Sequence, residues 1–439
     1  MARKEFKDSV WKFINILVVG GFQFLTFYLL ARIFEPERYG LFVLVMSAIV
    51  FFQSLAELGI PVSSSRHLTQ AIYSDSAPGD VVRAGAVLSI LLGIVSTLLC
   101  LIFSELIARI LKNASLAPLL KTAAILLLVN NIIRLFEELF KGVSEFRIPA
   151  ILNVITRPLQ LILVAGFVLS GLGIKGALYG IIISSAILAV AQAILFLTIY
   201  YPSLKKAART GAYFKQVFLY GIPIAFGVFA YFFYTKIDVL LLSYFKDTGE
   251  IAIYNVADMI YQLPLLLVMV IGAVVSPIVT REYTLRHHGK IQKIFTSLES
   301  FTFFIMLPVS FLLFLFSGVF IRVFFPEYPG AIILLKILSP VIIIKGMGQI
   351  VTAGFLISTG RAKILAWGTA IGAILNFLSD LILIPPYGAM GAVITTAVIH
   401  SLVILILLIY LLRALNLKLI ISFTSARNLL IENLSDRAR

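Results

Sequence analysis

The sequence predicts an all-α integral membrane protein of about twelve transmembrane helices, and three observations support this prediction. First, 60% of the 439 residues are hydrophobic and only 13% are charged, about half the charged share of a typical soluble domain. Second, apolar runs long enough to cross a bilayer recur along the chain. Third, lysine and arginine are distributed unevenly between alternate connections. A soluble protein of this size could not bury so much apolar surface, which excludes the soluble classes.

The spans follow from a length criterion, because a helix needs roughly 20 predominantly apolar residues to cross the hydrocarbon core. Runs of about this length occur at residues 13–31, 40–62, 85–108, 117–140, 148–170, 175–200, 215–235, 252–276, 297–320, 330–352, 362–384 and 389–412. The connections between them are short. None could hold a folded soluble domain.

The basic residues predict the orientation. If the N-terminus is cytoplasmic, inside segments carry 23 of the 36 lysines and arginines, outside segments carry 8, and the spans carry 5. Cytoplasmic segments of membrane proteins show such an excess, so both termini are expected in the cytoplasm. The net charge of +15 lies between apolar runs rather than in one patch, which favours contact with anionic lipid over nucleic acid.

The chain repeats itself at an interval of 215 residues. Gly-Ile-Lys-Gly-Ala at residues 173–177 is echoed by Gly-Ala-Met-Gly-Ala at 388–392, and Ser-Arg at 65–66 by Thr-Arg at 280–281. Two six-helix halves of the same order and orientation are implied. Such a parallel repeat places a site between the halves near the bilayer midplane.

The predicted domains are a six-helix bundle at residues 1–204, a second six-helix bundle at 205–414 and a cytoplasmic tail at 415–439. The polar, basic stretch from Lys205 to Lys215 is the natural linker. The tail alternates apolar and basic residues at roughly helical spacing, so it could form an interfacial helix on the membrane surface.

Basic residues inside the predicted spans are the candidate substrate-binding residues. They are Arg134, Arg157, Lys336 and Lys345. A central lysine or arginine costs roughly 2.5–3.5 kcal/mol on insertion scales, so each needs a partner or a watery cavity. A cavity with basic walls suits a pyrophosphate, which arginine can bind through two hydrogen bonds and lysine as a point charge.

A structural interpretation stands beside each of these assignments. Arg134 could pair along its own helix with Glu137 or Glu138, at spacings that place side chains together. Lys336 and its repeat counterpart Lys121 are near the predicted outer interface, where a lysine can extend its amine into the headgroups.

Acidic residues in or at the ends of spans are candidates for binding a coupling ion, either a proton or Na⁺. They are Asp258, Glu57 and Asp380, of which Asp258 is flanked by polar side chains on roughly one helix face. The alternative for Asp258 is a structural ion pair with one of the intramembrane bases.

No cofactor, metal site or catalytic residue is expected. The His287–His288 pair has no carboxylate or cysteine that would complete a metal-ligand set. The chain also has no glycine-rich phosphate loop of the Walker type.

Several motifs resemble a known family. They are Leu-Ala-Arg-Ile-Phe-Glu-Pro-Glu-Arg-Tyr-Gly-Leu-Phe at residues 30–42, Ala-Glu-Leu-Gly-Ile at 56–60, Asp-Val-Leu-Leu at 238–241, Tyr-Asn-Val-Ala at 254–257 and the run at 384–392. Together they resemble the polysaccharide-transporter, or oligosaccharide flippase, family of the multidrug/oligosaccharidyl-lipid/polysaccharide (MOP) exporter superfamily.

The resemblance implies two six-helix bundles in a V-shaped arrangement in the plasma (inner) membrane of a prokaryote. It also implies a function: flipping a polyprenyl-pyrophosphate-linked oligosaccharide from the cytoplasmic to the outer leaflet by alternating access. The implied partners are this lipid-linked glycan, membrane lipids and glycan-assembly enzymes. No covalent chemistry is needed, so the protein is not expected to be an enzyme.

Two other functions compete with this prediction. A cation-coupled multidrug or metabolite antiporter of the same superfamily would favour an acidic and aromatic cavity, whereas the bases listed above predict a basic one. A membrane glycosyltransferase or glycan polymerase usually needs a sizeable outer loop with catalytic residues. The outer connections here are short, which ranks this function lower.

Overall fold

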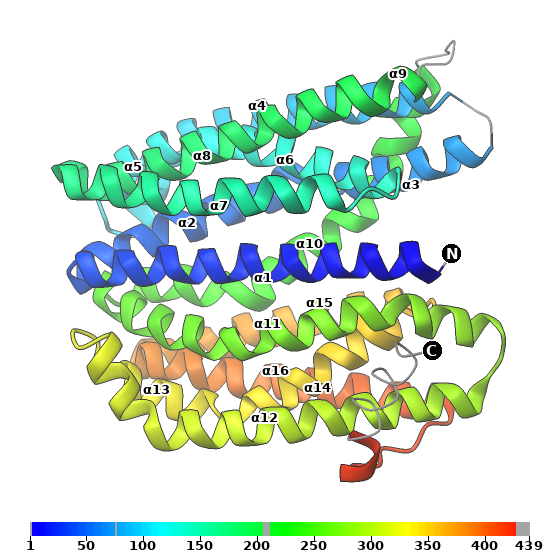
Figure 1. Ribbon diagram of the computed structural model, residues 1–439. Helices are drawn as coiled ribbons and strands as arrows, with labels where there is room; N and C mark the ends of the chain where they lie inside the picture. The colour runs from blue at the N-terminus through cyan, green and yellow to red at the C-terminus, as the bar shows by residue number, and fades with distance from the viewer. Residues whose placement is uncertain (1, 75–76, 205–210, 427–439) are drawn as a thin grey trace. The chain divides into compact units, whose positions relative to one another are not determined.

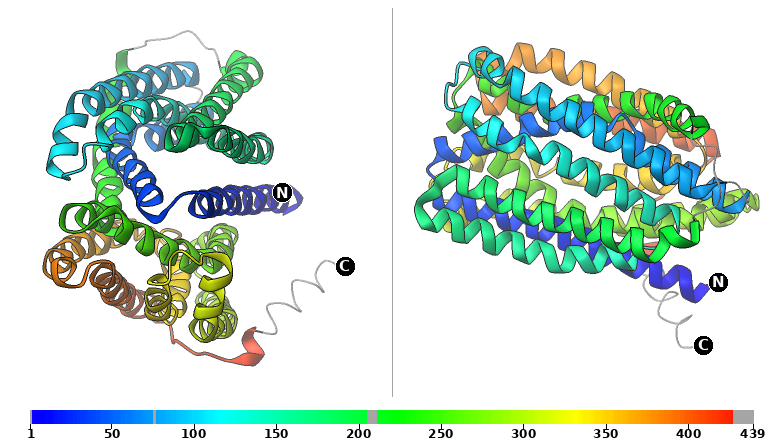
Figure 2. Two further views of the ribbon diagram at one scale, coloured as in Figure 1. Left: turned by 90° about the vertical axis from the view of Figure 1, so that its left-hand side faces the viewer. Right: turned by 90° about the horizontal axis from the view of Figure 1, so that it is seen from above.

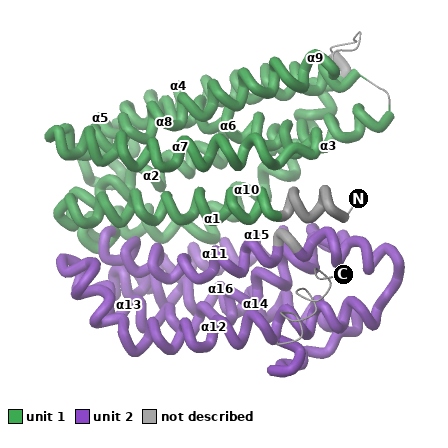
Figure 3. The backbone as a smooth tube through the Cα atoms, in the orientation of Figure 1, with its two compact units in different colours: residues 1–251 green, residues 252–439 purple. Residues whose placement is uncertain are grey.

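A computed structural model describes residues 2–74, 77–204 and 211–426, and every regular element in these ranges is a helix (Figure 1). The chain divides into two compact units, Met1–Ile251 and Ala252–Arg439 (Figure 3). The predicted all-α fold is confirmed. The predicted linker residues 205–210 and the last thirteen residues of the predicted tail, 427–439, lie outside the described residues.

The helices of the first unit are α1 (Ala2–Ile33), α2 (Pro36–Glu57), α3 (Ile60–Tyr73), α4 (Pro78–Ile110), α5 (Leu116–Ala123), α6 (Ile125–Gly142), α7 (Arg147–Phe167), η1 (Val168–Leu172), α8 (Gly173–Leu195), η2 (Phe196–Tyr200), α9 (Tyr201–Leu204) and α10 (Gly211–Phe245). Those that follow are α11 (Thr248–Thr284), α12 (His288–Phe324), α13 (Ala331–Leu338), α14 (Val341–Gln349), η3 (Ile350–Leu356), α15 (Ala362–Tyr387) and α16 (Ala389–Leu415). The η elements are π-helical turns. Within each unit the helices stand side by side (Figure 2).

The number of membrane crossings agrees with the sequence. Ten helical stretches in the described residues are long and apolar enough to cross a membrane, and α13 with α14 and η3 forms one more span bent by 51°. One of the ten, Arg147–Leu204, has 58 residues and would be about 87 Å long if straight, far more than the roughly 30 Å hydrocarbon core. It contains a turn at Gly171 and Gly173, beyond which α8 packs back on α7. This hairpin contains two crossings and brings the total to the expected twelve.

The 215-residue repeat is visible in the backbone. Gly173 has φ 55° and ψ −138°, and its counterpart Gly388 has φ 57° and ψ −134°. This conformation is accessible essentially only to glycine. The α5–α6 break at Ala124 likewise corresponds to the α13–α14 break after Leu338. The repeated sequence therefore encodes repeated helix breaks and turns.

The division predicted from the sequence repeat falls between residues 204 and 205, whereas the two compact units, defined by contacts within each, divide after Ile251. α10 begins after the predicted linker, yet it packs against α2, α3 and α4 of the first unit. The interior of that unit is a buried apolar cluster from α3, α4 and α6 that also includes Phe196. In lipid, such close side-chain packing holds helices together, because transfer from water no longer drives their association.

The described part of the tail begins as extended chain. Residues 417–422, called here the tail segment, are not helical and lie along the first turns of α12. Gln292 exchanges two hydrogen bonds of 2.8 Å with the backbone of Lys418, and the Ser300 hydroxyl bonds to the backbone of Ile420 and Ser422. The predicted position of the tail on the membrane surface stays a prediction.

Candidate functional site

The site in the first unit begins with a break in a membrane-spanning helix. α2 ends at Glu57, and Leu58 and Gly59 both adopt left-handed backbone conformations, with φ of 39° and 67°. At Gly59 a Cβ atom would lie 2.4 Å from the carbonyl oxygen of Gly221 on α10, so no larger residue fits without a shift. α3 then starts at Ile60. Interrupted helices of this kind build substrate and ion sites in many transporters.

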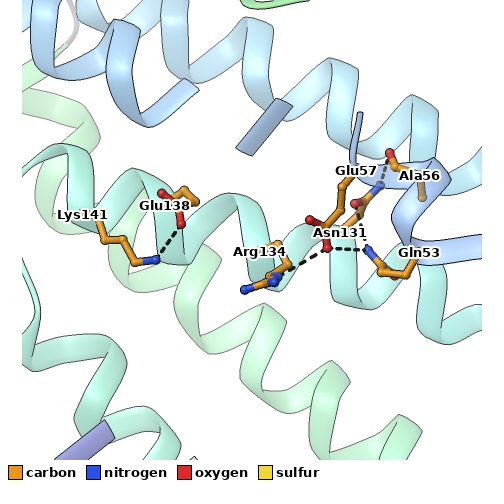
Figure 4. Close-up of polar contacts among 7 residues, drawn as sticks. All are labelled: Gln53, Ala56, Glu57, Asn131, Arg134, Glu138 and Lys141. Carbon is orange, nitrogen blue, oxygen red and sulfur yellow. Dashed lines mark hydrogen bonds and ion pairs between the residues drawn. The ribbon is translucent and has the colours of Figure 1, made fainter. Parts of the chain in front are cut away.

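Asn131 on α6 stabilises this break. Its side-chain amide donates to the carbonyl oxygens of Ala56 and Ser89, both at 3.2 Å, and Asn131 is fully buried (Figure 4). An unsatisfied carbonyl at membrane depth would cost several kcal/mol. The Oδ1 atom of Asn131 accepts a hydrogen bond from Gln53 at 3.2 Å, and the same Gln53 amide lies 3.3 Å from Glu57.

An ion pair completes the cluster. Arg134 Nε lies 3.4 Å from Glu57 Oε1, although the two residues are 77 positions apart (Figure 4). The Glu57 side chain is 13% exposed and that of Arg134 is 56% exposed. The structure shows no hydrogen-bond partner for the Nη1 and Nη2 atoms of Arg134 among the described residues. We call Gln53, Glu57, Asn131 and Arg134 the polar cluster.

A polar stripe continues along α6 from this cluster. One turn beyond Arg134, Glu138 forms a 2.6 Å ion pair with Lys141, close to the predicted cytoplasmic end of the helix (Figure 4). The predicted helical pair of Arg134 with Glu138 is therefore not the contact seen, because Glu138 bonds to Lys141 and Arg134 to Glu57. α6 thus carries charged side chains from its end to the broken helix.

Arg157 occupies a different part of the same unit. It lies on α7, half-buried, and its Nη1 atom donates to Gln160 at 3.0 Å. Its Nε atom is buried and has no hydrogen-bond partner in the part of the chain that the structure describes. One turn earlier, the fully buried Asn153 donates to Asn15 on α1 at 2.9 Å. No hydrogen bond or ion pair joins Arg157 to the polar cluster in the described chain.

The remaining predicted bases lie in the second unit. Lys345 on α14 is over the ring of Tyr261, 4.9 Å from its centroid. Asp258, one helical turn before Tyr261, accepts a 2.6 Å hydrogen bond from Gln262. Lys336 is half-buried on α13. The polar face predicted around Asp258 therefore exists, and Lys345 contacts the same stretch of α11.

Asp380 is fully buried on α15 and accepts a hydrogen bond of 3.1 Å from the equally buried Asn376. Lys121, the repeat counterpart of Lys336, forms a 2.7 Å ion pair with Glu105 at the exposed end of the first unit. The described residues contain no group of three or more histidines, cysteines, aspartates or glutamates placed to hold a metal ion.

The polar cluster has an uncharged counterpart in the second unit. Adding 215 to its positions gives Val268, Gly272, Gly346 and Gln349. The same pairs are neighbours: a Cβ on Gly272 would lie 3.6 Å from the Gln349 carbonyl, and one on Gly346 would lie 3.7 Å from Val268. The helix contacts are repeated, whereas at these positions the charged side chains occur only in the first unit and Gln349 is the one amide of the second.

Sequence reasoning found Glu57 and Arg134 separately, one as an ion-coupling candidate and one as a substrate-binding candidate, and the structure brings them together. It missed Gln53 and Asn131. The available signal was an amide inside an apolar run, because a buried polar group in a span needs partners and rarely occurs without a role.

Comparisons with known proteins agree with this architecture. The profile of the polysaccharide biosynthesis protein family matches residues 6–282, and that of the MatE family matches residues 223–382. The chain is 22% identical over 395 residues to Agl15 of Haloferax volcanii, a probable low-salt glycan biosynthesis flippase, covering 89% of this chain and 80% of the relative.

Solved structures share the fold. The lipid II flippase MurJ in an inward-closed conformation superposes with a TM-score of 0.74 at 18% identity, covering 98% of this chain and 93% of that one. An inward-facing multidrug-resistance MATE transporter of the MOP superfamily gives 0.74 at 16% identity, covering 93% and 94%. A MOP transporter of Pyrococcus furiosus gives 0.69 at 17%, covering 94% and 95%. The family predicted from the sequence is confirmed: this multi-pass membrane protein belongs to the polysaccharide biosynthesis protein family.

Proposed function

We propose that the protein is a flippase that moves a polyprenyl-pyrophosphate-linked oligosaccharide from the cytoplasmic to the outer leaflet by alternating access. The polar cluster binds the pyrophosphate on the cytoplasmic side, and the lipid tail stays in the bilayer. The protein works in the plasma membrane of a prokaryote with both termini in the cytoplasm. It receives its cargo from glycan-assembly enzymes and carries out no covalent chemistry itself.

One observation carries this proposal: Arg134 is held by Glu57 at Nε while its two terminal nitrogens have no partner in the described chain. Its side chain is 56% exposed. An arginine exposed to hydrocarbon at this depth would be costly, so we propose that its exposed end faces water. Two parallel N–H donors match two oxygens of a phosphate.

The fixed position of Arg134 matters as much as its charge. Glu57 and Asn131 tie α6 to the end of α2, so the guanidinium is oriented before a ligand arrives. Orientation in advance lowers the entropic cost of binding. Glu57 is already neutralised by Arg134, so this cluster does not offer a cationic drug an open carboxylate.

Binding can be tested by thermal stabilisation of the purified protein with polyprenyl pyrophosphate. A ligand at 100 times its dissociation constant stabilises the native state by about 2.7 kcal/mol. We expect a clear rise in Tm for the wild type. Arg134→Ala should abolish it, and Arg134→Lys should weaken binding about tenfold because the charge remains and the two-donor geometry is lost.

Arg109→Ala is the matched control, because Arg109 is an exposed arginine at the far end of α4. It should respond to the ligand like the wild type. The neutral polyprenol and cationic dyes complete the comparison. Stabilisation by dyes but not by polyprenyl pyrophosphate would refute the flippase proposal and support the antiporter.

A further inference from the structure

A buried acidic side chain, that of Glu299 on α12, lies away from the polar cluster. Glu299 has 0% of its surface exposed, and neither carboxyl oxygen has a hydrogen-bond partner within residues 2–74, 77–204 and 211–426. No lysine, arginine or histidine of the described chain forms an ion pair with it. Buried carboxylates in proteins are normally paired or hydrogen-bonded, so this one is exceptional.

Two contacts on the same face of α12 show what packs against Glu299. It shares a face of α12 with Phe295, one turn before it, and Thr302, one turn after it. Phe295 packs edge-on against Phe355 of η3, with ring centroids 5.2 Å apart. The Thr302 methyl lies 3.2 Å from where a Cβ on Gly346 of α14 would be. Glu299 therefore faces the stretch of α14 and η3 between these two contacts.

Thr302 is a second buried polar residue on this face of α12. Its Oγ1 atom has no hydrogen-bond partner among the residues that the structure describes. Two unpartnered polar groups thus lie one turn apart on the same face. The facing residues 346–356 contain no ionisable side chain. α13, α14 and the tail segment pack against α12 and carry Lys336, Lys345 and Lys418, none of which pairs with Glu299 in the described chain. On α11, Glu282 pairs with Lys290 of α12.

An ionised carboxylate without a partner in such surroundings is far more costly than the neutral acid. We infer that Glu299 is a proton-binding site of the second unit, occupied by a proton in this conformation and emptied when α12 separates from α14 and η3. Separation admits water, the proton passes to that water, and the carboxylate left behind is hydrated.

The elements facing Glu299 have the features of a movable contact. The span that contains them is bent by 51° between α13 and α14, and η3 is a π-helical stretch of seven residues. π-helical turns are rare and concentrate at functional sites. The facing stretch thus follows a bend and itself contains a π-helical segment, so it is a point at which the packing against α12 can change.

Infrared spectroscopy tests the proton directly and needs no transport substrate. The wild-type protein in nanodiscs at neutral pH should show the carbonyl stretch of a protonated carboxyl, and Glu299→Gln should remove it. Glu327→Gln is the matched control, because Glu327 is an exposed acid in the connection after α12. It should leave the band unchanged. A band of equal intensity in the wild type and Glu299→Gln would overturn the inference.

Proton release tests the second half of the inference. Polyprenyl pyrophosphate is added to the protein in weakly buffered solution with a pH dye. The wild type should release protons, whereas proton release from Glu299→Gln should fall to background while the ligand still raises the Tm of this variant. Equal release from both proteins would refute the coupling. If the wild type shows no thermal shift, the proposed cargo is wrong, and the same release measurement is made with whichever cationic dye stabilises the protein.

Discussion

The ion pair between Arg134 and Glu57 is asymmetric, since the glutamate is 13% exposed and the arginine 56% exposed. Replacing Arg134 with methionine leaves a largely buried carboxylate with only the Gln53 amide beside it. Replacing Glu57 with glutamine leaves a guanidinium that water can solvate. Arg134→Met should therefore destabilise the fold more than Glu57→Gln does.

The size of the coupling energy between Arg134 and Glu57 follows from the geometry of the ion pair. Two unit charges 3.4 Å apart attract by about 5 kcal/mol at an effective dielectric constant of 20. The exposure of Arg134 screens most of this, and polar pairs measured within membrane proteins couple by about 0.6 kcal/mol on average and about 1.7 at most. We expect a coupling energy of about 1–1.5 kcal/mol, with losses of about 2.5 kcal/mol for Arg134→Met and about 1 for Glu57→Gln.

A double-mutant cycle measures this coupling. The free energy of unfolding of the wild type, both single variants and Arg134→Met/Glu57→Gln is determined by reversible denaturation in mixed micelles. The double variant should lose only about 2 kcal/mol, less than the two single losses added together. Additive losses, or a larger loss for Glu57→Gln than for Arg134→Met, would show that the pair does not have the assigned energetic role.

Three further predictions concern stability and the tail. Asn131→Ala should cost about 2–4 kcal/mol in thermal unfolding, because the carbonyl oxygens of Ala56 at the helix break and of Ser89 on α4 lose their donor; a loss below 1 kcal/mol would contradict this. Gly173→Ala and Gly388→Ala should each cost about 1–3 kcal/mol of unfolding free energy from backbone strain. Gly227→Ala is the control and should cost nothing, because Gly227 has open space around it. Equal melting temperatures for all three variants would refute the argument. Ser300→Ala should speed protease cleavage of the tail segment roughly tenfold through loss of two hydrogen bonds, and an unchanged rate would show that these bonds do not hold it.

The sequence predicted the spans well because membrane crossing imposes a length on each apolar run. The 117–140 and 148–170 spans correspond to the described 116–142 and 147–167 helices within a few residues. α12 is much longer than its span at 297–320, since it begins at His288. Hydropathy reports only the part inside hydrocarbon, and a helix can continue into water beyond it.

The site was harder to predict because its contacts are not local. The break after Glu57 requires the close approach of Gly221, which is far away in sequence, and Gly59 and Pro61 beside it do not by themselves interrupt the apolar run. The Glu57–Arg134 pair joins two helices that hydropathy treats separately. Glu299 falls near the end of its predicted span, where an acidic residue is ordinarily solvated, and only its packing shows that it is buried.

The uncharged counterpart of the polar cluster separates the helix contact, which both units share, from the charged side chains, which only the first unit has at these positions. Positions 57 and 134 are in contact as glutamate and arginine, and their counterparts 272 and 349 are in contact as glycine and glutamine. The same helix contact thus accepts either pair. Importing the second unit's residues as Glu57→Gly/Arg134→Gln removes both charges together, so no charge is left buried without a partner.

We expect Glu57→Gly/Arg134→Gln to remain folded and to lose about 2–3 kcal/mol, slightly more than Arg134→Met/Glu57→Gln because of the glycine, yet to show no thermal stabilisation by polyprenyl pyrophosphate. Arg134→Ala in the same assay leaves Glu57 buried without its charged partner, so the comparison separates loss of the ligand contact from the cost of an unpaired carboxylate. A double variant that still responds to the ligand would place the anion site elsewhere. One that fails to fold would mean that the ion pair, rather than the repeated helix contact, holds α2 against α6.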